Sequence, residues 1–214
     1  MPPPQLALAH ATAGRAVLRW LRAELRGRDR VPGAGGVILA PNHLSLIDIP
    51  LMGAASPRPC WYLGKAELEG GVVGGALEAF GMVPISRGRG DAATLARLTR
   101  MVAGGEVVTV FPEGSRSPDG RLHRLRSGVA RLAAAARAPV VPVGLVGTEQ
   151  WWPRQGRPER LRPAPGTITV AFGVPLAPPD DAPAPRRRFT AALTEALAAC
   201  SGQERAPGYA PIAS

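Results

Sequence analysis

Short apolar runs recur along the chain and alternate with helix-like segments. The runs are VILA (37–40), WYL (61–63), MVPIS (82–86), EVVTVF (106–111), VVPVGLV (140–146) and TITVAF (167–172). Amphipathic patterns predict helices at 91–105, 127–139 and about 186–200. Apolar runs of this length are typical of buried parallel strands. The pattern therefore predicts an α/β fold: a single domain with a mostly parallel central sheet flanked by helices.

A further helix is predicted near the N-terminus, from about Ala13 to Arg26. Its arginines lie on one face and its large apolar residues on the other: Arg15, Arg19, Arg22 and Arg26 against Val17, Leu18, Trp20, Leu21 and Leu25. A basic amphipathic helix of this kind can lie in a membrane surface, or it can dock on the domain as an ordinary surface helix. Glu24, in the middle of the apolar face, favours docking.

The chain divides on these grounds into three parts. Residues 1–30 form an N-terminal tail and the basic amphipathic helix, 31–200 form the main domain, and 201–214 form a flexible tail. No stretch of the length needed to span a bilayer is both apolar and free of charge, so no transmembrane helix is predicted. The N-terminus also lacks the pattern of a secretory signal peptide.

The net charge of the chain indicates which kinds of partner it favours. Lysine and arginine number 26 against 16 acidic residues, a net charge of +10, and every cation except Lys65 is arginine. Such a chain favours anionic partners: nucleic acid, anionic lipid or a phosphorylated substrate. A nucleic-acid-binding protein is the main non-enzymatic alternative. Aromatic residues are only 5% of the chain, and no element for reading or stacking bases is visible.

The remaining composition points to a cytosolic protein without a metal. Cys60 and Cys200 lie far apart, so two reduced thiols are expected. No two histidines have metal-ligand spacing, and no metal site is predicted. His10 and His123 receive no catalytic role.

The segment PNHLSLIDIP, residues 41–50, follows the first apolar run. Ligands bind at the carboxyl ends of strands in open α/β sheets, where Asn42 and His43 would lie. Pro50 disfavours a helix through residues 46–50, so we expect a turn at 44–47 and a helix from about Asp48. The turn would bring the Asp48 carboxylate to the His43 ring and fix its tautomer for general-base catalysis. Alternatively, Asp48 only caps the helix.

The segment FPEGSRSPDG, residues 111–120, follows a second strand at the same edge of the sheet. Gly114 would let the backbone approach a ligand, and Arg116 can hold a phosphate with two hydrogen bonds. The alternative is a surface loop whose arginine forms a salt bridge.

These segments resemble the conserved blocks of the glycerolipid acyltransferases, the lysophosphatidic acid acyltransferase family. NHLSLID resembles the family's N-H-x-x-x-x-D block, and FPEGSR resembles its F-P-E-G-[ST]-R block. Two weaker blocks follow the family's order, GMVPISR (81–87) and VVPVGLVG (140–147). The resemblance spans roughly residues 37–147 and implies the glycerol-3-phosphate acyltransferase-like fold.

The resemblance implies an O-acyltransferase that uses acyl-CoA or acyl carrier protein as donor and a lysophospholipid as acceptor. His43 would be the general base, with Asp48 orienting it. The positions that would shape the acceptor site are Asn42, Lys65, Arg87, Glu113, Gly114, Ser115 and Arg116. Backbone N–H groups near the His43 turn could stabilise the oxyanion.

The first acceptor to consider is 1-acyl-sn-glycerol 3-phosphate, which would give phosphatidic acid. Another lysolipid, an acyl-ornithine, a glycolipid or a tailoring substrate remain alternatives. No cofactor or metal is expected. We expect a cytoplasmic enzyme, peripheral on the inner face of the cell membrane, with an anionic membrane surface as a partner and no nucleic acid.

Overall fold

The structure, a computed structural model, describes residues 4–65, 81–85, 91–154 and 162–211. Within these ranges seven strands form one sheet: β1 Glu24–Arg26, β2 Val37–Pro41, β3 Cys60–Lys65, β4 Met82–Ile85, β5 Val107–Thr109, β6 Val140–Val146 and β7 Thr169–Phe172. The helices described are α1 Pro4–Leu21, α2 Asp48–Ala55, α4 Asp91–Ala103, α5 Gly128–Ala136, α6 Thr148–Trp151 and α7 Pro183–Ser201, with a 3-10 turn at Arg28–Arg30.

The strand order in the sheet is β1-β7-β6-β2-β5-β3-β4. The five strands β6, β2, β5, β3 and β4 are parallel to one another. Strand β7 is antiparallel to β6, and β1 is parallel to β7. The predicted α/β fold with a mostly parallel sheet is confirmed. Strand β2 lies between β5 and β6, so the segments that follow these three strands meet at one edge of the sheet.

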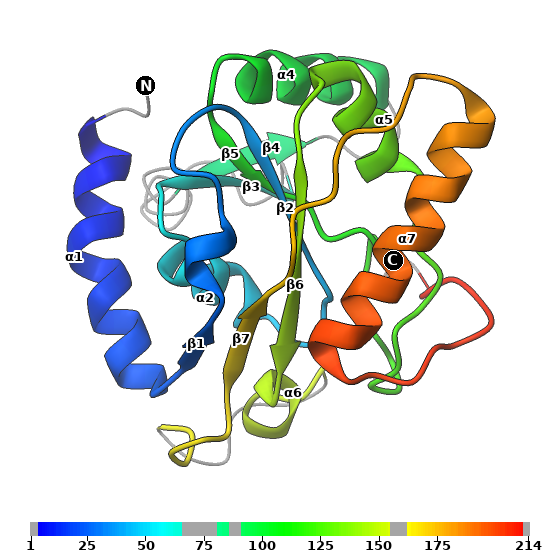
Figure 1. Cartoon of the computed structure of the whole chain (residues 1–214). Helices are drawn as coiled ribbons and strands as arrows, with labels where there is room; N and C mark the ends of the chain where they lie inside the picture. Colours follow the sequence, from blue (N-terminus) through cyan, green and yellow to red (C-terminus); the bar gives the residue numbers. More distant parts are fainter. Residues whose placement is uncertain (1–3, 66–80, 86–90, 155–161, 212–214) are drawn as a thin grey trace.

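Helices cover both faces of the sheet (Figure 1). Alternate residues of β2 face opposite sides, as the pleat of a strand requires. Val37 and Leu39 pack in one apolar cluster with residues of α1 and α2. Ile38 and Ala40 pack in the other cluster with residues of α4, α5 and α7. Because both faces of the central strands are buried, their sequences are continuous apolar runs.

The predicted N-terminal helix is wrong in its bounds. It begins at Pro4 and ends at Leu21, because Arg22 adopts a left-handed backbone with φ of 50°. The N–H of Glu24 then donates to the carbonyl of Ile168, and residues 24–26 join the sheet as β1. The Glu24 side chain pairs with Arg26 at the exposed edge, so it does not interrupt an apolar helix face.

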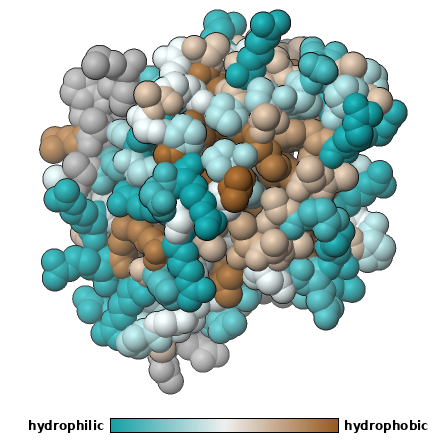
Figure 2. Space-filling view, viewed as in Figure 1, coloured by the Kyte–Doolittle hydropathy of each residue, from teal (hydrophilic) through white to brown (hydrophobic). Residues whose placement is uncertain are grey.

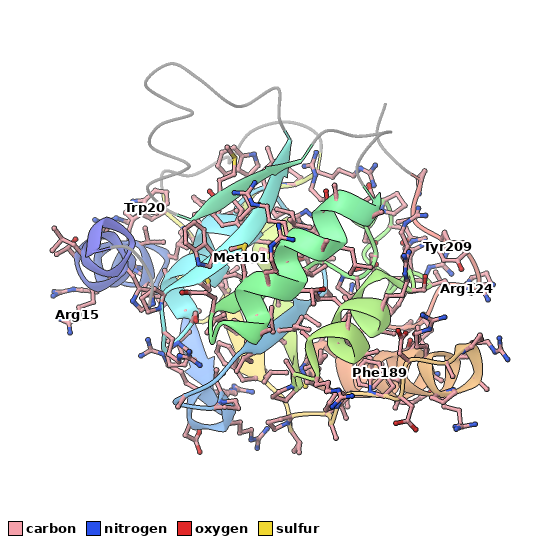
Figure 3. The ribbon with its side chains drawn as sticks, turned by 90° about the horizontal axis from the view of Figure 1, so that it is seen from above. Arg15, Trp20, Met101, Arg124, Phe189 and Tyr209 are labelled. Atoms are coloured by element: carbon pink, nitrogen blue, oxygen red, sulfur yellow. The ribbon has the colours of Figure 1, made fainter. Side chains whose placement is uncertain are left out.

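Helix α1 docks on the domain. Its Leu21 is fully buried, which contributes about 1.5–3 kcal/mol. Gly14 lies against Ala54 of α2, where an added Cβ would come within 3.4 Å of the Ala54 Cα. Figure 3 shows Arg15 on the outer side of α1 and Trp20 on the side toward the sheet. Because α1 packs on α2 and β1 belongs to the sheet, residue 30 does not separate two structural units.

The segment after α7 also differs from the flexible tail that the sequence suggested. The N–H of Leu122 donates to the carbonyl of Glu204, and the N–H of Ala206 donates back to Leu122. Ala210 is buried. Backbone hydrogen bonds and apolar burial therefore hold residues 202–211 against the loop that precedes α5.

In the view of Figure 2, hydrophilic residues gather toward the outline of the molecule. Apolar residues show near the centre of this view, where in Figure 1 the segment after β7 runs beside β6. Val174, which belongs to the segment after β7, is 67% exposed. Among the residues that the structure describes, no helix combines the length and apolarity needed to cross a bilayer.

Candidate active site

The site is built where β2 and β5 end. These strands are adjacent and parallel, with Val37 opposite Val107. The residues that follow them, Asn42 and His43 in one case and Pro112 and Glu113 in the other, therefore lie side by side. The expected turn and helix are present, since α2 begins at Asp48. Pro50 falls in the first turn of this helix, where its missing N–H breaks no helical hydrogen bond.

The His43 ring contacts the Asp48 carboxylate, as the spacing suggested. Nδ1 of His43 lies 2.8 Å from Oδ2 of Asp48. The same oxygen accepts the N–H groups of Leu44 at 2.6 Å and Ser45 at 2.8 Å. Asp48 is fully buried. A carboxylate only accepts hydrogen bonds, so Nδ1 carries the ring proton and Nε2 has a free lone pair.

Three further contacts fix His43. Its ring stacks on Phe111, with centroids 4.0 Å apart. Its N–H donates to Oε1 of Glu113 at 3.0 Å, and its carbonyl accepts the N–H of Ser117 at 2.7 Å. The side chain is 12% exposed. The imidazole is thus held by its backbone, one ring face and one nitrogen, while part of the ring reaches the surface.

Glu113 lies behind the site and joins two loops. Oε1 accepts from His43, and Oε2 accepts the N–H of His123 at 2.9 Å. The residue is fully buried, and this burial raises the pKa of the carboxyl to about 7, against the lowering effect of the two amide hydrogen bonds. Both oxygens of Glu113 bind backbone amides, so Glu113 does not present a free carboxylate to a ligand. It positions residues 43–48, the candidate catalytic turn, which we call the catalytic turn.

Asn42 also binds backbone. Its Nδ2 donates to the carbonyl of Leu145 at 2.9 Å and to Oε1 of Gln203 at 2.8 Å, and its Oδ1 accepts the N–H of Leu145 at 2.6 Å. It is fully buried. Asn42 therefore ties the ends of β2 and β6 to the segment after α7.

The arginine expected to hold a phosphate has a second arginine beside it. Nη1 of Arg116 donates to the carbonyl of Arg154 at 3.1 Å, and Nη1 of Arg154 donates to the carbonyl of Arg116. Burial and the Arg154 charge lower the pKa of Arg116. No carboxylate of the described residues forms an ion pair with either guanidinium. We call Arg116 and Arg154 the arginine pair.

For the remaining predicted site residues, the structure describes the backbone but shows no hydrogen bond with His43 or Asp48, or does not describe the side chain. Gly114 has φ of 75°, and an added Cβ would come within 2.7 Å of Nε of Arg126, so the turn itself requires glycine. Ser115, which precedes Arg116, is half-buried. Lys65 ends β3, but its side chain is outside the described residues, as is all of Arg87.

The turn offers fewer free backbone donors than the sequence suggested. The N–H groups of His43, Leu44 and Ser45 are all bound to Glu113 or Asp48. These three N–H groups are therefore not free to bind an oxyanion.

Sequence reasoning missed two residues of this site, Phe111 and Arg154. Phe111 is the first residue of the FPEGSR segment, so an aromatic at the end of the predicted strand was a usable signal. Arg154 had no such signal, since it follows α6 and is 38 positions from Arg116 in the sequence. In the part of the chain that the structure describes, no group of three or more His, Cys, Asp or Glu side chains is placed to hold a metal ion.

A histidine oriented by a buried aspartate, at the carboxyl edge of a mostly parallel sheet, has the chemistry to act as a general base, and the paired arginines near it have the chemistry to bind an anion. The family model described as Acyltransferase matches residues 22–146, more than half of the chain. The chain belongs to this acyltransferase family.

The chain is also similar to two 1-acyl-sn-glycerol-3-phosphate acyltransferases. The chain is 30% identical over 188 residues to 1-acyl-sn-glycerol-3-phosphate acyltransferase alpha of Mus musculus, covering 84% of this chain and 64% of that protein. It is 29% identical over 149 residues to 1-acyl-sn-glycerol-3-phosphate acyltransferase BAT2, chloroplastic, of Brassica napus, covering 68% of this chain and 43% of that protein. The chain thus spans less than two thirds of the length of either relative.

A solved structure supports the fold. The crystal structure of the 1-acyl-sn-glycerophosphate (LPA) acyltransferase PlsC from Thermotoga maritima matches with a TM-score of 0.67 at 24% identity, covering 89% of this chain and 77% of that one.

Proposed function

We propose that this protein transfers a fatty acyl group from acyl-CoA or acyl carrier protein to the free hydroxyl of a lysophospholipid. The proposed acceptor is 1-acyl-sn-glycerol 3-phosphate, and the product is phosphatidic acid. The observation that carries the proposal is the 2.8 Å contact between His43 and Asp48, at the sheet edge that also bears Arg116. The family, and the activity named for the two relatives, support the same reaction.

In the proposed mechanism His43 acts as the general base. A hydroxyl is a weak nucleophile at neutral pH, so Nε2 of His43 removes its proton as the oxygen attacks the thioester carbonyl. Asp48 stabilises the imidazolium that forms. The tetrahedral intermediate then collapses, the C–S bond breaks, and the leaving thiolate takes the proton from His43. Donor and acceptor react directly, and no acyl-enzyme is formed.

The arginine pair would hold the phosphate of the acceptor. Arginine can bind phosphate with two parallel hydrogen bonds, and two guanidinium groups suit a doubly charged phosphate monoester. Ser117 connects Arg116 to the base, because its N–H donates to the His43 carbonyl. A phosphate bound at the pair would thus lie near the catalytic turn. An acceptor without a phosphate, such as an acyl-ornithine or a glycolipid, would use this pair differently.

The proposal extends to the membrane that carries the acceptor. Arg15 and Arg19 are exposed on the outer side of α1, and together with Trp20 and Arg162 they line a surface hollow. Helix α1 packs its apolar side on the domain, so attachment would rest on attraction between these arginines and anionic headgroups. We place the enzyme in the cytoplasm, peripheral on the inner face of the cell membrane.

Thiol release from acyl-CoA, measured with and without 1-acyl-sn-glycerol 3-phosphate, tests the proposal. Release that depends on the acceptor, with phosphatidic acid as the product, is the expected result. Acyl carrier protein as donor and other lysolipids as acceptors are the parallel reactions. Absence of acyl transfer in every donor and acceptor combination would contradict the proposed activity. Binding of duplex DNA at low salt would instead favour the nucleic-acid alternative.

A further inference from the structure

A second charged hollow lies away from the His43 turn. It has a volume of about 490 Å³ and is formed by the loop before α5, by α5 itself, by α7 and by the segment after α7. Four arginines line it: Arg124, Arg131, Arg186 and Arg187. No acidic residue is among its described lining residues. We call it the arginine pocket.

The charge of this pocket is mostly uncompensated. Arg186 forms an ion pair with Asp181, with 2.9 Å between Nη1 and Oδ1. The guanidinium groups of Arg124, Arg131 and Arg187 form no ion pair with a carboxylate of the described residues. Like charges gathered around one hollow repel each other, and a ligand with several negative charges relieves that repulsion. The pocket is therefore suited to a polyanion.

One wall of the pocket is aromatic. The Tyr209 side chain lies at the surface, with the residue 48% exposed. The guanidinium carbons of Arg124 and Arg126 lie 5.1 and 5.2 Å from its ring centroid. Figure 3 shows Arg124 and Tyr209 together at one side of the molecule. Aromatic rings and guanidinium planes are the groups on which nucleic-acid bases stack, so this wall adds a preference for a flat heterocycle.

The pocket is connected to the active site through one carboxylate. His123 immediately precedes Arg124, and its N–H donates to Oε2 of Glu113. The other oxygen of Glu113 accepts the N–H of His43. The wall of the pocket and the catalytic turn are thus held by the two oxygens of a single buried side chain.

We propose that the arginine pocket binds a nucleotide with several phosphates, and that this nucleotide is the nucleotide end of acyl-CoA. This inference rests on the proposed function. Coenzyme A carries three phosphate groups and an adenine, which match the cations and the aromatic wall. Its long pantetheine arm separates the nucleotide from the thioester, so the two ends of the donor can bind at different places on the protein. A concave pocket of this size suits a small nucleotide better than the convex surface of an acidic carrier protein.

Direct binding is the first test. The probe is adenosine 3′,5′-bisphosphate, titrated calorimetrically into the native protein and into the double variant Arg124→Ala/Arg187→Ala. The matched control is Arg97→Ala/Arg100→Ala, which removes the same charge from exposed positions on α4. The pocket variant should bind at least about tenfold more weakly, because two charge-assisted contacts are lost. No binding to the native protein, or equal weakening in both variants, overturns the proposal.

Kinetics distinguishes the donor from a free nucleotide. With acyl-CoA the pocket variant should show a KM raised about tenfold. With acyl-pantetheine, which has the same thioester but no nucleotide, its KM should equal that of the native protein. Nucleotide binding without any change in the KM for acyl-CoA would overturn the assignment to the donor and leave a site for a free nucleotide. Because the binding test needs no acyl transfer, failure of the proposed function would leave its result intact.

Discussion

The catalytic turn and the arginine-bearing surfaces satisfy their polar groups in opposite ways. At the turn, the backbone N–H and Nδ1 of His43 and the Oδ2 of Asp48 have hydrogen-bond partners within the chain. At the arginine pair and in most of the arginine pocket, the guanidinium groups form no ion pair with a carboxylate of the described residues; Arg186, which pairs with Asp181, is the exception. This difference in internal partners corresponds to two different tasks in the proposed reaction. In the proposed function the turn is preorganised before substrate arrives, whereas the arginines would gain their partner from an anionic ligand.

Loss of the charge at the turn should have a large effect. Asp48→Asn removes the carboxylate that stabilises the imidazolium and selects its tautomer, so kcat/KM should fall by about 10²–10⁴-fold. Asp180→Asn, in the exposed segment before α7, is the matched control and should leave kcat/KM unchanged. Thermal unfolding of both variants separates a folding defect from a catalytic one. Near-native kcat/KM in a folded Asp48→Asn protein would remove Asp48 from the mechanism.

Loss of one member of the arginine pair should have an intermediate effect that depends on the acceptor. Arg154→Ala should raise the KM for 1-acyl-sn-glycerol 3-phosphate by about 10- to 100-fold, since a charged hydrogen bond to phosphate is lost. The KM for an uncharged monoacylglycerol should not change. Arg97→Ala on α4 serves as the control. An equal effect on both acceptors would mean that Arg154 supports the loop and does not bind phosphate.

Glu113 should affect the free energy of unfolding and the way this free energy changes with pH. Its pKa in the folded protein, about 7, lies above the ordinary value of 4.5. The folded state therefore holds this proton more tightly than the unfolded state. The contribution of the carboxyl to stability is complete below the unfolded pKa and is lost as the pH rises through the folded pKa.

Glu113→Gln cannot titrate and provides the reference. The free energy of unfolding of the native protein, relative to this variant, should fall by about 1–3 kcal/mol between about pH 4.5 and pH 7.5. Urea unfolding at a series of pH values measures it. Parallel curves for the two proteins would show that the pKa of Glu113 is the same in the folded and unfolded states.

The smallest expected effect concerns the membrane. Arg15→Gln/Arg19→Gln should weaken binding to anionic vesicles about five- to tenfold at low salt, and less as salt is raised. These substitutions test the surface better than deletion of residues 1–30, which would also remove Leu21 from the core and β1 from the sheet. Arg97→Gln/Arg100→Gln carries the same charge change elsewhere. Equal loss in both proteins would indicate attraction by net charge alone.

The hydrophobic pattern predicted the fold well wherever strands are buried on both faces. It missed β1, a three-residue strand at the sheet edge whose residues Glu24 and Arg26 are exposed and polar. It also extended the first helix past Leu21, because the backbone of Arg22 takes a left-handed conformation that residue type does not predict.

The site was predictable where its contacts are local. His43 and Asp48 are five positions apart, and their spacing was enough to suggest the contact. Most partners of Asn42 and Glu113 are groups that folding brings from distant segments, such as Leu145 and Gln203 for Asn42 and His43 for Glu113. Arg154 likewise reaches Arg116 only through the packing of α6. Such long-range partners have no local pattern in the sequence.

The central claim is that His43 is the general base, and a pair of histidine variants tests it most directly. His10→Ala is the matched control, since Nε2 of His10 contacts only the Ser56 carbonyl among the described residues, at 2.8 Å. The measurement is the acceptor-dependent release of thiol from acyl-CoA at neutral pH. His43→Ala should lose about a thousandfold in kcat, whereas His10→Ala should stay close to the native rate. A folded His43→Ala protein that keeps the native rate would contradict the account.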